Sequence, residues 1–261
     1  MPQRISGTRE WAVAEENCIV GCEHDCRYCY AKYNAVEKFK TVRPGDWTNM
    51  VVDHKALNNP CKKHDGMVMF PTRHDITPST LKTCIQKITA ILAAGNQVLI
   101  VTKPHPEVIS ELCDEFYPYD GVHFRFTIGA RDDKILEYWE PGAPCYADRM
   151  ESLKMAFEDE FPTSISCEPM LDEMDIVALF EDCKPFVSDT FWIGKMNHTD
   201  HRVKVETDED RAMLKAIEEG QTDVRIWEIY NKLRHEPKIR WKESIKKVCG
   251  LDLATEAGLN E

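Results

Sequence analysis

A regular alternation of short apolar runs and helical segments constrains the fold of this 261-residue chain more than any other feature. Residues 67–70 form a brief apolar run, and Thr77 with Pro78 then supplies an N-cap and a first helical position. Apolar side chains follow at helical spacing over residues 81–92, and Gly95 ends that helix. This segment therefore predicts one strand–helix unit.

The same unit recurs along the chain. Residues 11–20 form a first predicted strand, and residues 30–39 carry the apolar spacing of a helix. The remaining strands are expected at 67–70, 98–102, 122–128, 163–168 and 190–194, with helices at 81–92, 107–116, 132–139, 147–157 and 172–183. Strands that alternate with helices pair in parallel through right-handed crossovers. The expected fold is therefore α/β, with six strands that curl into a partial (β/α)6 barrel.

No linker rich in Gly, Ser or Pro divides the chain. We expect residues 1–200 to form the barrel and residues 201–261 to form a helical extension packed on it. The N-terminus lacks the apolar core of a signal peptide, and no apolar run approaches the roughly 20 residues that a membrane span needs. A soluble, cytoplasmic protein with reduced cysteines is therefore expected.

Three of the eleven cysteines fall within eight residues, as CxxxCxxC at Cys22, Cys26 and Cys29. A structural zinc site needs four closed ligands, whereas a 4Fe-4S cluster can be held through three irons while the fourth stays open. The spacing therefore favours a cluster with one free iron. The alternatives are a disulfide framework, or a zinc site whose fourth ligand is His24, Cys18 or Cys61.

Polar side chains also follow the predicted strands, and the carboxyl ends of parallel strands meet at one rim. The residues in question are Thr72 and Asp75 after the second strand, Lys103 after the third, Thr127 after the fourth and Glu168 after the fifth. The cysteine loop follows the first strand and therefore belongs to the same rim. Polar groups from several strand ends should converge there with the three thiols on one candidate site.

The cysteine loop resembles the signature of radical S-adenosylmethionine (SAM) enzymes, because Tyr28 and Tyr30 flank its last cysteine. Together with "VTK" at 101–103 and "FRFTIGARDDKILEYWEPGAP" at 124–144, it looks like the family that includes spore photoproduct lyase. The match covers most of residues 15–200. Radical SAM enzymes have a partial (β/α)6 barrel, which agrees with the strand count.

This resemblance implies a chemistry. Cys22, Cys26 and Cys29 would ligate a 4Fe-4S cluster whose open iron holds SAM. A low-potential donor of the flavodoxin or ferredoxin type would reduce the cluster. Cleavage of SAM would then give methionine and a 5'-deoxyadenosyl radical, which takes a hydrogen atom from the substrate.

The resemblance also implies which side chains contact SAM. Tyr28 would lie beside the adenine, Lys103 would contact the carboxylate, and Thr127 would contribute its hydroxyl. The segment "SCEPML" at 166–171 looks like a segment of phage-associated relatives and adds Glu168 as a contact to SAM or substrate. Thr72 and Asp75 complete the set of cofactor-binding candidates.

One position departs from the family. In spore photoproduct lyase a cysteine at the end of the second strand donates the hydrogen atom, and Thr72 occupies the matching place here. A threonine O–H bond is too strong to replace it, so lesion repair by the same route is in doubt. Cys145, Cys167 and Tyr30 are the candidates for a radical relay, with a buried structural thiol as the simpler interpretation of both cysteines.

The net charge of −12, from 33 basic and 45 acidic residues, argues against a general polyanion binder. Residues 225–247 are an exception, with eight Lys or Arg around Trp227, Tyr230 and Trp241. This segment is either a nucleic-acid surface or a helix face packed on the barrel. The expected function is a radical SAM enzyme acting on a nucleic acid or nucleotide. The alternatives are a small metabolite or peptide as substrate, and a non-catalytic iron–sulfur or zinc-binding protein.

Overall fold

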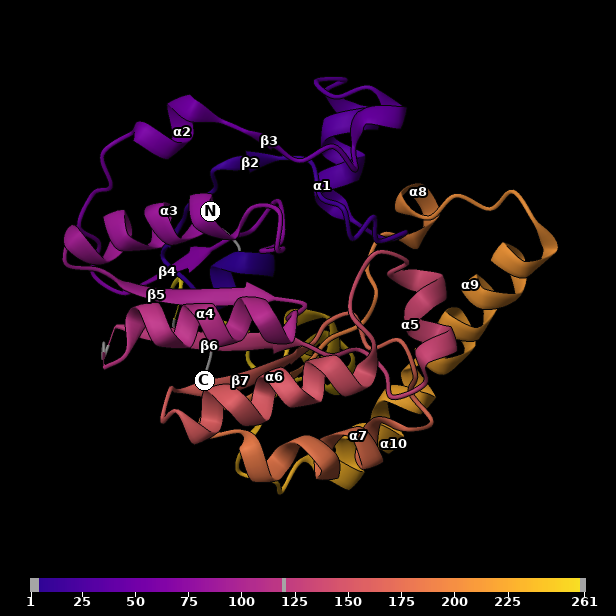
Figure 1. Ribbon diagram of the computed structural model, residues 1–261. Helices are drawn as coiled ribbons and strands as arrows, with labels where there is room; N and C mark the ends of the chain where they lie inside the picture. The colour runs from indigo at the N-terminus through magenta and orange to yellow at the C-terminus, as the bar shows by residue number, and fades with distance from the viewer. Residues whose placement is uncertain (1–4, 119–120, 259–261) are drawn as a thin grey trace.

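The computed structural model of the chain describes residues 5–118 and 121–258. Its centre is one sheet of seven parallel strands, whose spatial order follows their order in the chain (Figure 1). The strands are β1 (Ala14–Glu15), β4 (Met67–Phe70), β5 (Gln97–Thr102), β6 (Val122–Thr127), β7 (Thr163–Cys167), β8 (Phe191–Ile193) and β9 (Ile239–Trp241). Because all pairs are parallel, the carboxyl ends lie at one edge. The predicted α/β class and open, partial barrel are confirmed.

Helices connect the strands and cover one face of the sheet; α4 and α6 lie in front of it in Figure 1. The connecting helices are α3 (Leu81–Ala93), α4 (Pro106–Phe116), α5 (Asp133–Trp139), α6 (Tyr146–Glu158) and α7 (Ile176–Cys183). Phe124 and Phe126 of β6 are fully buried in the same core as Ile109 and Leu112 of α4. Burial of these apolar side chains holds the helices against the sheet.

The opposite, concave face carries the alternate side chains of the strands. Met69 of β4 and Trp192 of β8 form a separate buried cluster there with Trp11, which follows the 3-10 turn η1 (Gly7–Glu10). The Arg125 guanidinium lies 4.8 and 5.3 Å from the ring centroids of Trp11 and Trp192. The N-terminal segment therefore packs inside the open barrel.

The segment after residue 200 differs from the expected helical extension. Its helices are α8 (Thr199–Arg202), α9 (Asp208–Gly220), α10 (Asp223–Leu233) and α11 (Glu243–Cys249), and the strand β9 lies between the last two. Ile239 and Trp241 of β9 join the main core, and β9 pairs in parallel with β8. Three residues are too few to display a strand periodicity, so the sequence pattern did not predict this seventh strand.

An ion pair links the two free edges of the sheet. Glu10 lies before β1 and Lys242 follows β9, and the Lys242 Nζ is 2.9 Å from Glu10 Oε1. The same ammonium is 3.2 Å from Glu168 Oε2 and donates to the Gly7 carbonyl at 2.8 Å. Lys242 is only 1% exposed, so it is an internal residue and not part of a basic surface.

Between β1 and β4 the chain leaves the main sheet. It forms the antiparallel strands β2 (Ile19–Val20) and β3 (Val51–Val52), the helices α1 (Tyr30–Lys32) and α2 (His54–Asn58), the π-helical turn η2 (Tyr33–Lys38) and the 3-10 turn η3 (Pro44–Asp46). Only Ala14 and Glu15 of the expected first strand pair with the main sheet. Among the described residues, no helix combines the length and apolarity needed to cross a membrane.

Candidate functional site

The cysteine loop connects β2 to α1 and is fixed by local backbone contacts. Cys22 and Cys26 are buried, and Cys29 is half-buried. The N–H of Cys22 donates to the Trp47 carbonyl at 2.9 Å. Cys29 is the N-cap of α1, where its Sγ accepts a hydrogen bond from the Lys32 N–H at 3.4 Å. These contacts fix the backbone at Cys22 and the side chain of Cys29.

The loop between α5 and α6 packs directly against the cysteine loop. The N–H of Gly142 donates to the His24 carbonyl at 3.0 Å, and the N–H of Arg27 donates to the Trp139 carbonyl at 2.9 Å. A Cβ at Gly142 would lie 2.1 Å from the Glu23 carbonyl oxygen. Only glycine therefore permits this close approach of two backbone segments.

Burial raises the pKa of all three thiols above that of an ordinary cysteine. The charge of Asp75 and the other two thiols add to this effect at Cys22, so the thiols lie close enough to influence one another. Burial raises the pKa of Cys26 to about 12, although the positive charge of Lys103 opposes the rise. The metal-free thiols therefore keep their protons at neutral pH, and a metal must displace them.

His24, one of the expected fourth ligands of a zinc site, has other partners in the structure. Its Nδ1 lies 3.1 Å from Asp75 Oδ2, and its Nε2 lies 2.9 Å from His105 Nε2. The eleven cysteines, all within the described residues, are free thiols.

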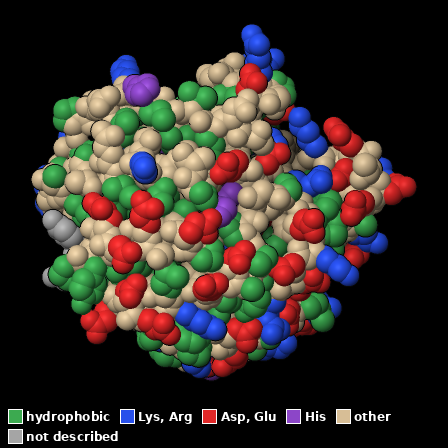
Figure 2. Space-filling view, in the orientation of Figure 1, with side chains coloured by type: hydrophobic (Ala, Val, Ile, Leu, Met, Phe, Trp, Pro, Cys, Tyr) green, Lys and Arg blue, Asp and Glu red, His purple; other side chains and the backbone are tan. Residues whose placement is uncertain are grey.

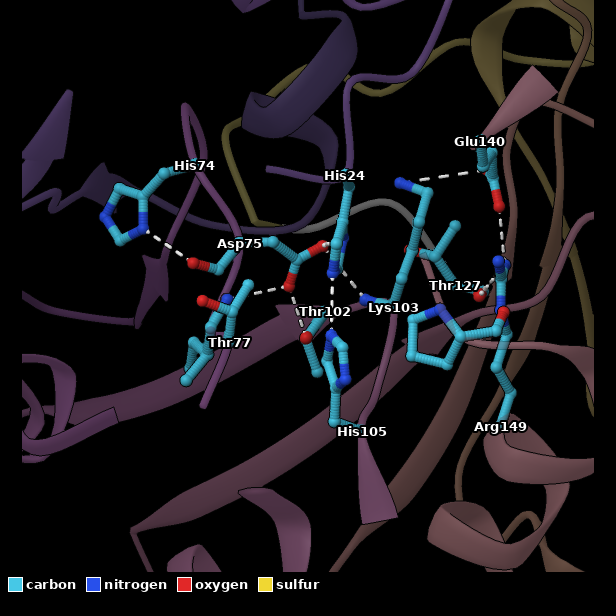
Figure 3. A network of polar contacts seen from close by, with 12 residues as sticks. His24, His74, Asp75, Thr77, Thr102, Lys103, His105, Thr127, Glu140 and Arg149 are labelled. Atoms are coloured by element: carbon cyan, nitrogen blue, oxygen red, sulfur yellow. Dashed lines mark hydrogen bonds and ion pairs between the residues drawn. The ribbon is translucent and has the colours of Figure 1, made fainter. Parts of the chain in front are cut away.

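Asp75 is the centre of a buried network that joins three loops (Figure 3). Its carboxylate contacts His24 and accepts hydrogen bonds from the Thr102 hydroxyl, the Lys103 N–H at 3.1 Å and the Ile76 N–H at 2.8 Å. Burial opposes ionisation, but His24 and Lys103 outweigh it and hold the pKa of Asp75 below its usual range. Both carboxylate oxygens already have partners, so Asp75 holds the loops of the rim together. A direct contact of Asp75 with a cofactor stays a prediction.

Lys103 and Tyr28, two of the expected SAM contacts, meet at Glu140. The Lys103 Nζ lies 3.8 Å from Glu140 Oε1 (Figure 3), and the Tyr28 hydroxyl donates to the same oxygen. Burial alone would lower the pKa of Lys103, but Cys26, Glu140 and Asp75 outweigh it and raise the pKa. The ammonium is charged and its ion pair is long, so it retains donors for a further anion.

Glu140 is also held by Arg149, on α6. The Arg149 Nη1 lies 2.6 Å from Glu140 Oε2, and both side chains are fully buried. Arg149 donates to the carbonyls of Pro144 at 2.8 Å and Thr127 at 3.1 Å, which ties the α5–α6 loop to the end of β6. Sequence analysis missed Glu140 and Arg149 because a buried ion pair leaves no local pattern. In the sequence, Glu140 lies within the segment 124–144, and Arg149 lies near the start of the helix predicted at 147–157. Neither position by itself indicates that the two side chains pair.

Thr72 and Tyr30 connect α1 to the carboxyl end of β4. The Tyr30 hydroxyl donates to the Thr72 carbonyl. The Asn17 side chain donates to the Thr72 hydroxyl at 2.8 Å and accepts the Thr72 N–H at 2.9 Å. Both residues therefore have a structural role at the rim. Contact of Thr72 with a cofactor, and a radical on Tyr30, stay predictions.

Glu168 belongs to the charged group around Lys242. Burial raises the pKa of Glu168, although its contact with Lys242 opposes this effect. A Cβ at Gly194 would lie 2.9 Å from the Glu168 Cγ and 3.0 Å from the Lys242 Cγ, so glycine makes room for the pair. A contact of Glu168 with SAM or substrate stays a prediction.

The two cysteines expected as relay candidates lie in different parts of the fold. Cys167 is fully buried in the core with Ile165, on the helix-covered face of β7, and its Sγ lies 3.8 Å from the Gly129 carbonyl. Its side chain belongs to the main core, which agrees with the simpler interpretation as a structural thiol, and its relay role stays a prediction. Cys145 is the half-buried N-cap of α6, and its relay role stays a prediction.

The basic segment 225–247 is divided between surface and core. Trp241 is buried and packs on Tyr230 at a ring distance of 5.4 Å, and Lys242 is internal. The exposed members are Arg225, Trp227, Lys232, Arg234 and Lys247. Acidic and basic side chains are interspersed over the face of the molecule that Figure 2 shows. The exposed cations therefore lie on α10, at its end and on α11, and they cover a smaller area than the sequence indicated.

Sequence comparison gives a distant relative. No family model matches the chain. An uncharacterised protein of Methanocaldococcus jannaschii is 23% identical over 177 residues, which cover 66% of this chain and 66% of that protein. The match thus spans about two thirds of the length of the curated relative.

Solved structures define the class of fold. The open parallel barrel, with a cysteine loop at its carboxyl edge, is the fold of radical SAM enzymes. More specifically, the fold of this chain is similar to the fold of spore photoproduct lyase. The complex of that enzyme with dinucleoside spore photoproduct has a TM-score of 0.55 and 14% identity, over 92% of this chain and 79% of that chain. A mutant of it with bound AdoMet and dinucleoside spore photoproduct has a TM-score of 0.51 and 14% identity, over 86% of this chain and 74% of that chain.

Proposed function

We propose that the chain is a radical SAM enzyme, in which Cys22, Cys26 and Cys29 hold a 4Fe-4S cluster and SAM binds between the cluster and the barrel. One observation carries the proposal. The three thiols lie together beside Lys103 and Glu140, at the carboxyl edge of an open parallel barrel like that of spore photoproduct lyase. A structure of that enzyme contains bound AdoMet, which supports SAM as the cofactor here.

The residues present fit such a cluster. Thiols are the donors that iron–sulfur clusters use, and the imidazole of the loop, His24, is engaged with Asp75 and His105. A cluster held by the three thiols alone would leave one iron open for SAM. When bound, the cluster would supply the electron that splits the sulfonium of SAM into methionine and the 5'-deoxyadenosyl radical.

The chain's own groups would orient SAM. Lys103 would pair with the carboxylate, because its ammonium is charged and has donors to spare. Glu140 accepts the Tyr28 hydroxyl and so fixes the ring that would lie against the adenine. Thr127 would contribute its hydroxyl from the end of β6. Trp11 and its apolar neighbours line the concave face and would exclude water from the site.

For the substrate we propose a nucleic acid or nucleotide. Spore photoproduct lyase binds a dinucleoside photoproduct in its solved complex. In this chain the Arg202 guanidinium lies 6.0 Å from the Tyr30 ring, and its buried Nε lacks a hydrogen-bond partner within the part of the chain that the structure describes. A guanidinium with donors to spare suits an anionic group such as phosphate. Exposed cations of α10 offer a second contact for the same polyanion.

A short oligonucleotide tests this substrate class. Its binding should fall steeply with salt, because each neutralised phosphate releases counterions, and Arg202→Gln should weaken it. Binding that is undetectable or insensitive to salt would favour the alternative, a small metabolite or peptide. Because Thr72 stands in place of the family's donor cysteine, the proposal does not include lesion repair by the same route.

This activity would also require an electron donor and a reducing compartment. A low-potential donor of the flavodoxin or ferredoxin type would reduce the cluster, and the chain would work in a reducing cytoplasm, where free cysteines persist. The eleven free thiols are consistent with such a compartment. Reduction of the reconstituted protein by purified flavodoxin or ferredoxin, in place of dithionite, tests the first requirement.

Anaerobic reconstitution tests the central proposal. We expect one 4Fe-4S cluster per chain, and methionine with 5'-deoxyadenosine from SAM after reduction with dithionite. Cys22→Ala, Cys26→Ala or Cys29→Ala should each abolish both the cluster absorption and SAM cleavage, whereas Cys18→Ala and Cys61→Ala should spare them. A cluster without SAM cleavage would indicate a non-catalytic iron–sulfur protein. Zinc bound in place of iron would indicate the zinc alternative.

A further inference from the structure

A second group of metal-ligating side chains lies outside the cysteine loop. His198, Asp200 and His201 come from the turn after β8 and from α8, and all three are exposed. The His201 ring packs on Tyr33 of η2 at a centroid distance of 5.0 Å. The group therefore lies next to the helical segment that follows the cysteine loop, where Figure 1 shows α8 near α1.

The three side chains present their ligand atoms to a common point. One ligand atom from each, two imidazole nitrogens and a carboxylate oxygen, lies within 4.8 Å of the other two. Asp200 Oδ1 and His201 Nδ1 are 2.9 Å apart. Neighbouring ligands of an ion with bonds of about 2.1 Å lie roughly 3.0 to 3.4 Å apart, so a small closure of the group would complete the geometry.

The backbone conformation of His198 is consistent with a ligand site at this turn. His198 has φ +62° and ψ +39°, in the left-handed region that side-chain-bearing residues rarely adopt. Such strained positions collect at ligand and active sites. The left-handed turn brings the His198 ring to 5.1 Å from the His201 ring.

Two neighbouring charges act on an ion bound to this group. The Arg202 guanidinium repels a cation, and the Asp200 carboxylate attracts it.

We propose that His198, Asp200 and His201 form a binding site for a divalent transition metal such as Zn²⁺, separate from the thiols. Two imidazoles and one carboxylate are the protein ligands of zinc and non-haem iron sites that keep positions open. The three side chains are exposed, so water or an anionic oxygen occupies the remaining positions. This inference goes beyond the proposed function and does not depend on SAM chemistry.

Titration of the reconstituted, full-length protein with ZnCl₂ tests the site. We expect one Zn²⁺ per chain by calorimetry and by metal analysis after gel filtration. His198→Ala and His201→Ala should each weaken binding at least about tenfold, because even the loss of an outer-sphere partner typically costs about that much. His235→Ala removes an exposed histidine from another part of the surface and should leave the affinity unchanged.

A cluster-free variant separates this site from the thiols. The triple variant Cys22→Ala, Cys26→Ala, Cys29→Ala should bind Zn²⁺ with the same affinity as the parent chain. The inference is overturned if the parent binds no Zn²⁺, or if the histidine variants bind it as tightly as the parent. Loss of Zn²⁺ binding in the cysteine variant would likewise overturn it, because the ion would then belong to the thiols.

Discussion

At the scale of single residues, the candidate site depends on buried charges that neutralise one another. Glu140 and Arg149 are fully buried, and the Lys103 side chain is 14% exposed. An isolated charge in such surroundings would cost several kcal/mol, so each requires its partners. Arg149 is close to Glu140 while Lys103 is 3.8 Å from it. Lys103 is also the more exposed of the two cations, so an incoming anion can reach it more readily than it can reach Arg149.

Lys103→Ala should weaken SAM binding by about 1.5 to 3 kcal/mol, the range for a hydrogen bond to a charged group. Iron content should not change, because Lys103 is not a metal ligand. Calorimetry with SAM on the reconstituted protein measures the effect, and Lys134→Ala, an exposed lysine of α5, is the control. An unchanged affinity would mean that Lys103 serves only its ion pair with Glu140.

The lowered pKa of Asp75 predicts that the stability of the fold depends on pH. Its pKa in the folded chain is lowered, so its charge stabilises the fold above the unfolded pKa of about 3.9. That contribution is lost as the pH falls through the folded pKa. Asp75→Asn should lower the free energy of unfolding by roughly 1.5 to 3 kcal/mol at pH 7, and by less at pH 3. Urea unfolding at both pH values checks this; an equal loss at both would contradict the role of the charge.

At the scale of elements, the rim is built by loops that hold one another. The α5–α6 loop contacts the cysteine loop through backbone hydrogen bonds at Gly142 and Arg27. Arg149 fastens the same loop to the end of β6. Short loops at the ends of rigid strands can thus place thiols and charges together, although their own sequences have no regular structure. The position of the thiols therefore depends on the α5–α6 loop as well as on their own spacing.

Gly142→Ala should disturb the cysteine loop. Its Cβ would lie 2.1 Å from the Glu23 carbonyl oxygen, and such overpacking costs about 1 to 3 kcal/mol. We expect lower stability in urea and less iron per chain after reconstitution. Gly45→Ala is the matched control, because a Cβ there meets no atom within 4 Å. Normal iron content in Gly142→Ala would show that the thiols are positioned independently of this contact.

At the scale of the whole molecule, an open barrel has two free sheet edges and a concave face to fill. Trp11 of the N-terminal segment packs on that face. Lys242 forms ion pairs with Glu10, which precedes the edge strand β1, and with Glu168, which follows β7. The C-terminal segment contributes β9 and this lysine, so it completes the barrel. Both ends of the chain therefore belong to one structural unit with the site.

Lys242→Met should destabilise the protein by roughly 3 to 5 kcal/mol, since it removes the cation that Glu10 and Glu168 share in a buried setting. Lys247→Met is the control, because Lys247 forms a surface pair with Glu243 whose loss should cost less than about 1 kcal/mol. Urea unfolding of both variants makes the comparison. Equal effects would show that Lys242 is not needed to link the sheet edges.

The sequence by itself determined the class of fold and drew attention to the three clustered cysteines, because the patterns behind both are local. Apolar spacing predicted a helix over residues 107–116, and α4 is Pro106–Phe116. The periodicity of a helix or a strand repeats every few residues and needs no distant partner. The CxxxCxxC spacing is equally local. The strand β9 has only three residues and shows no repeat, so the sequence pattern did not predict it.

Only the tertiary structure decided which side chains meet. Glu140, at the end of α5, joins Lys103 after β5 and Tyr28 in the cysteine loop, and nothing near Glu140 in the sequence indicates those partners. Lys242 stands in a basic segment yet is buried, and Cys167 stands at a strand end yet faces the outer core. Burial and pairing depend on how the sheet curls and which loops close over it. Those are properties of the assembled chain, and they set the charge and orientation of every group in the site.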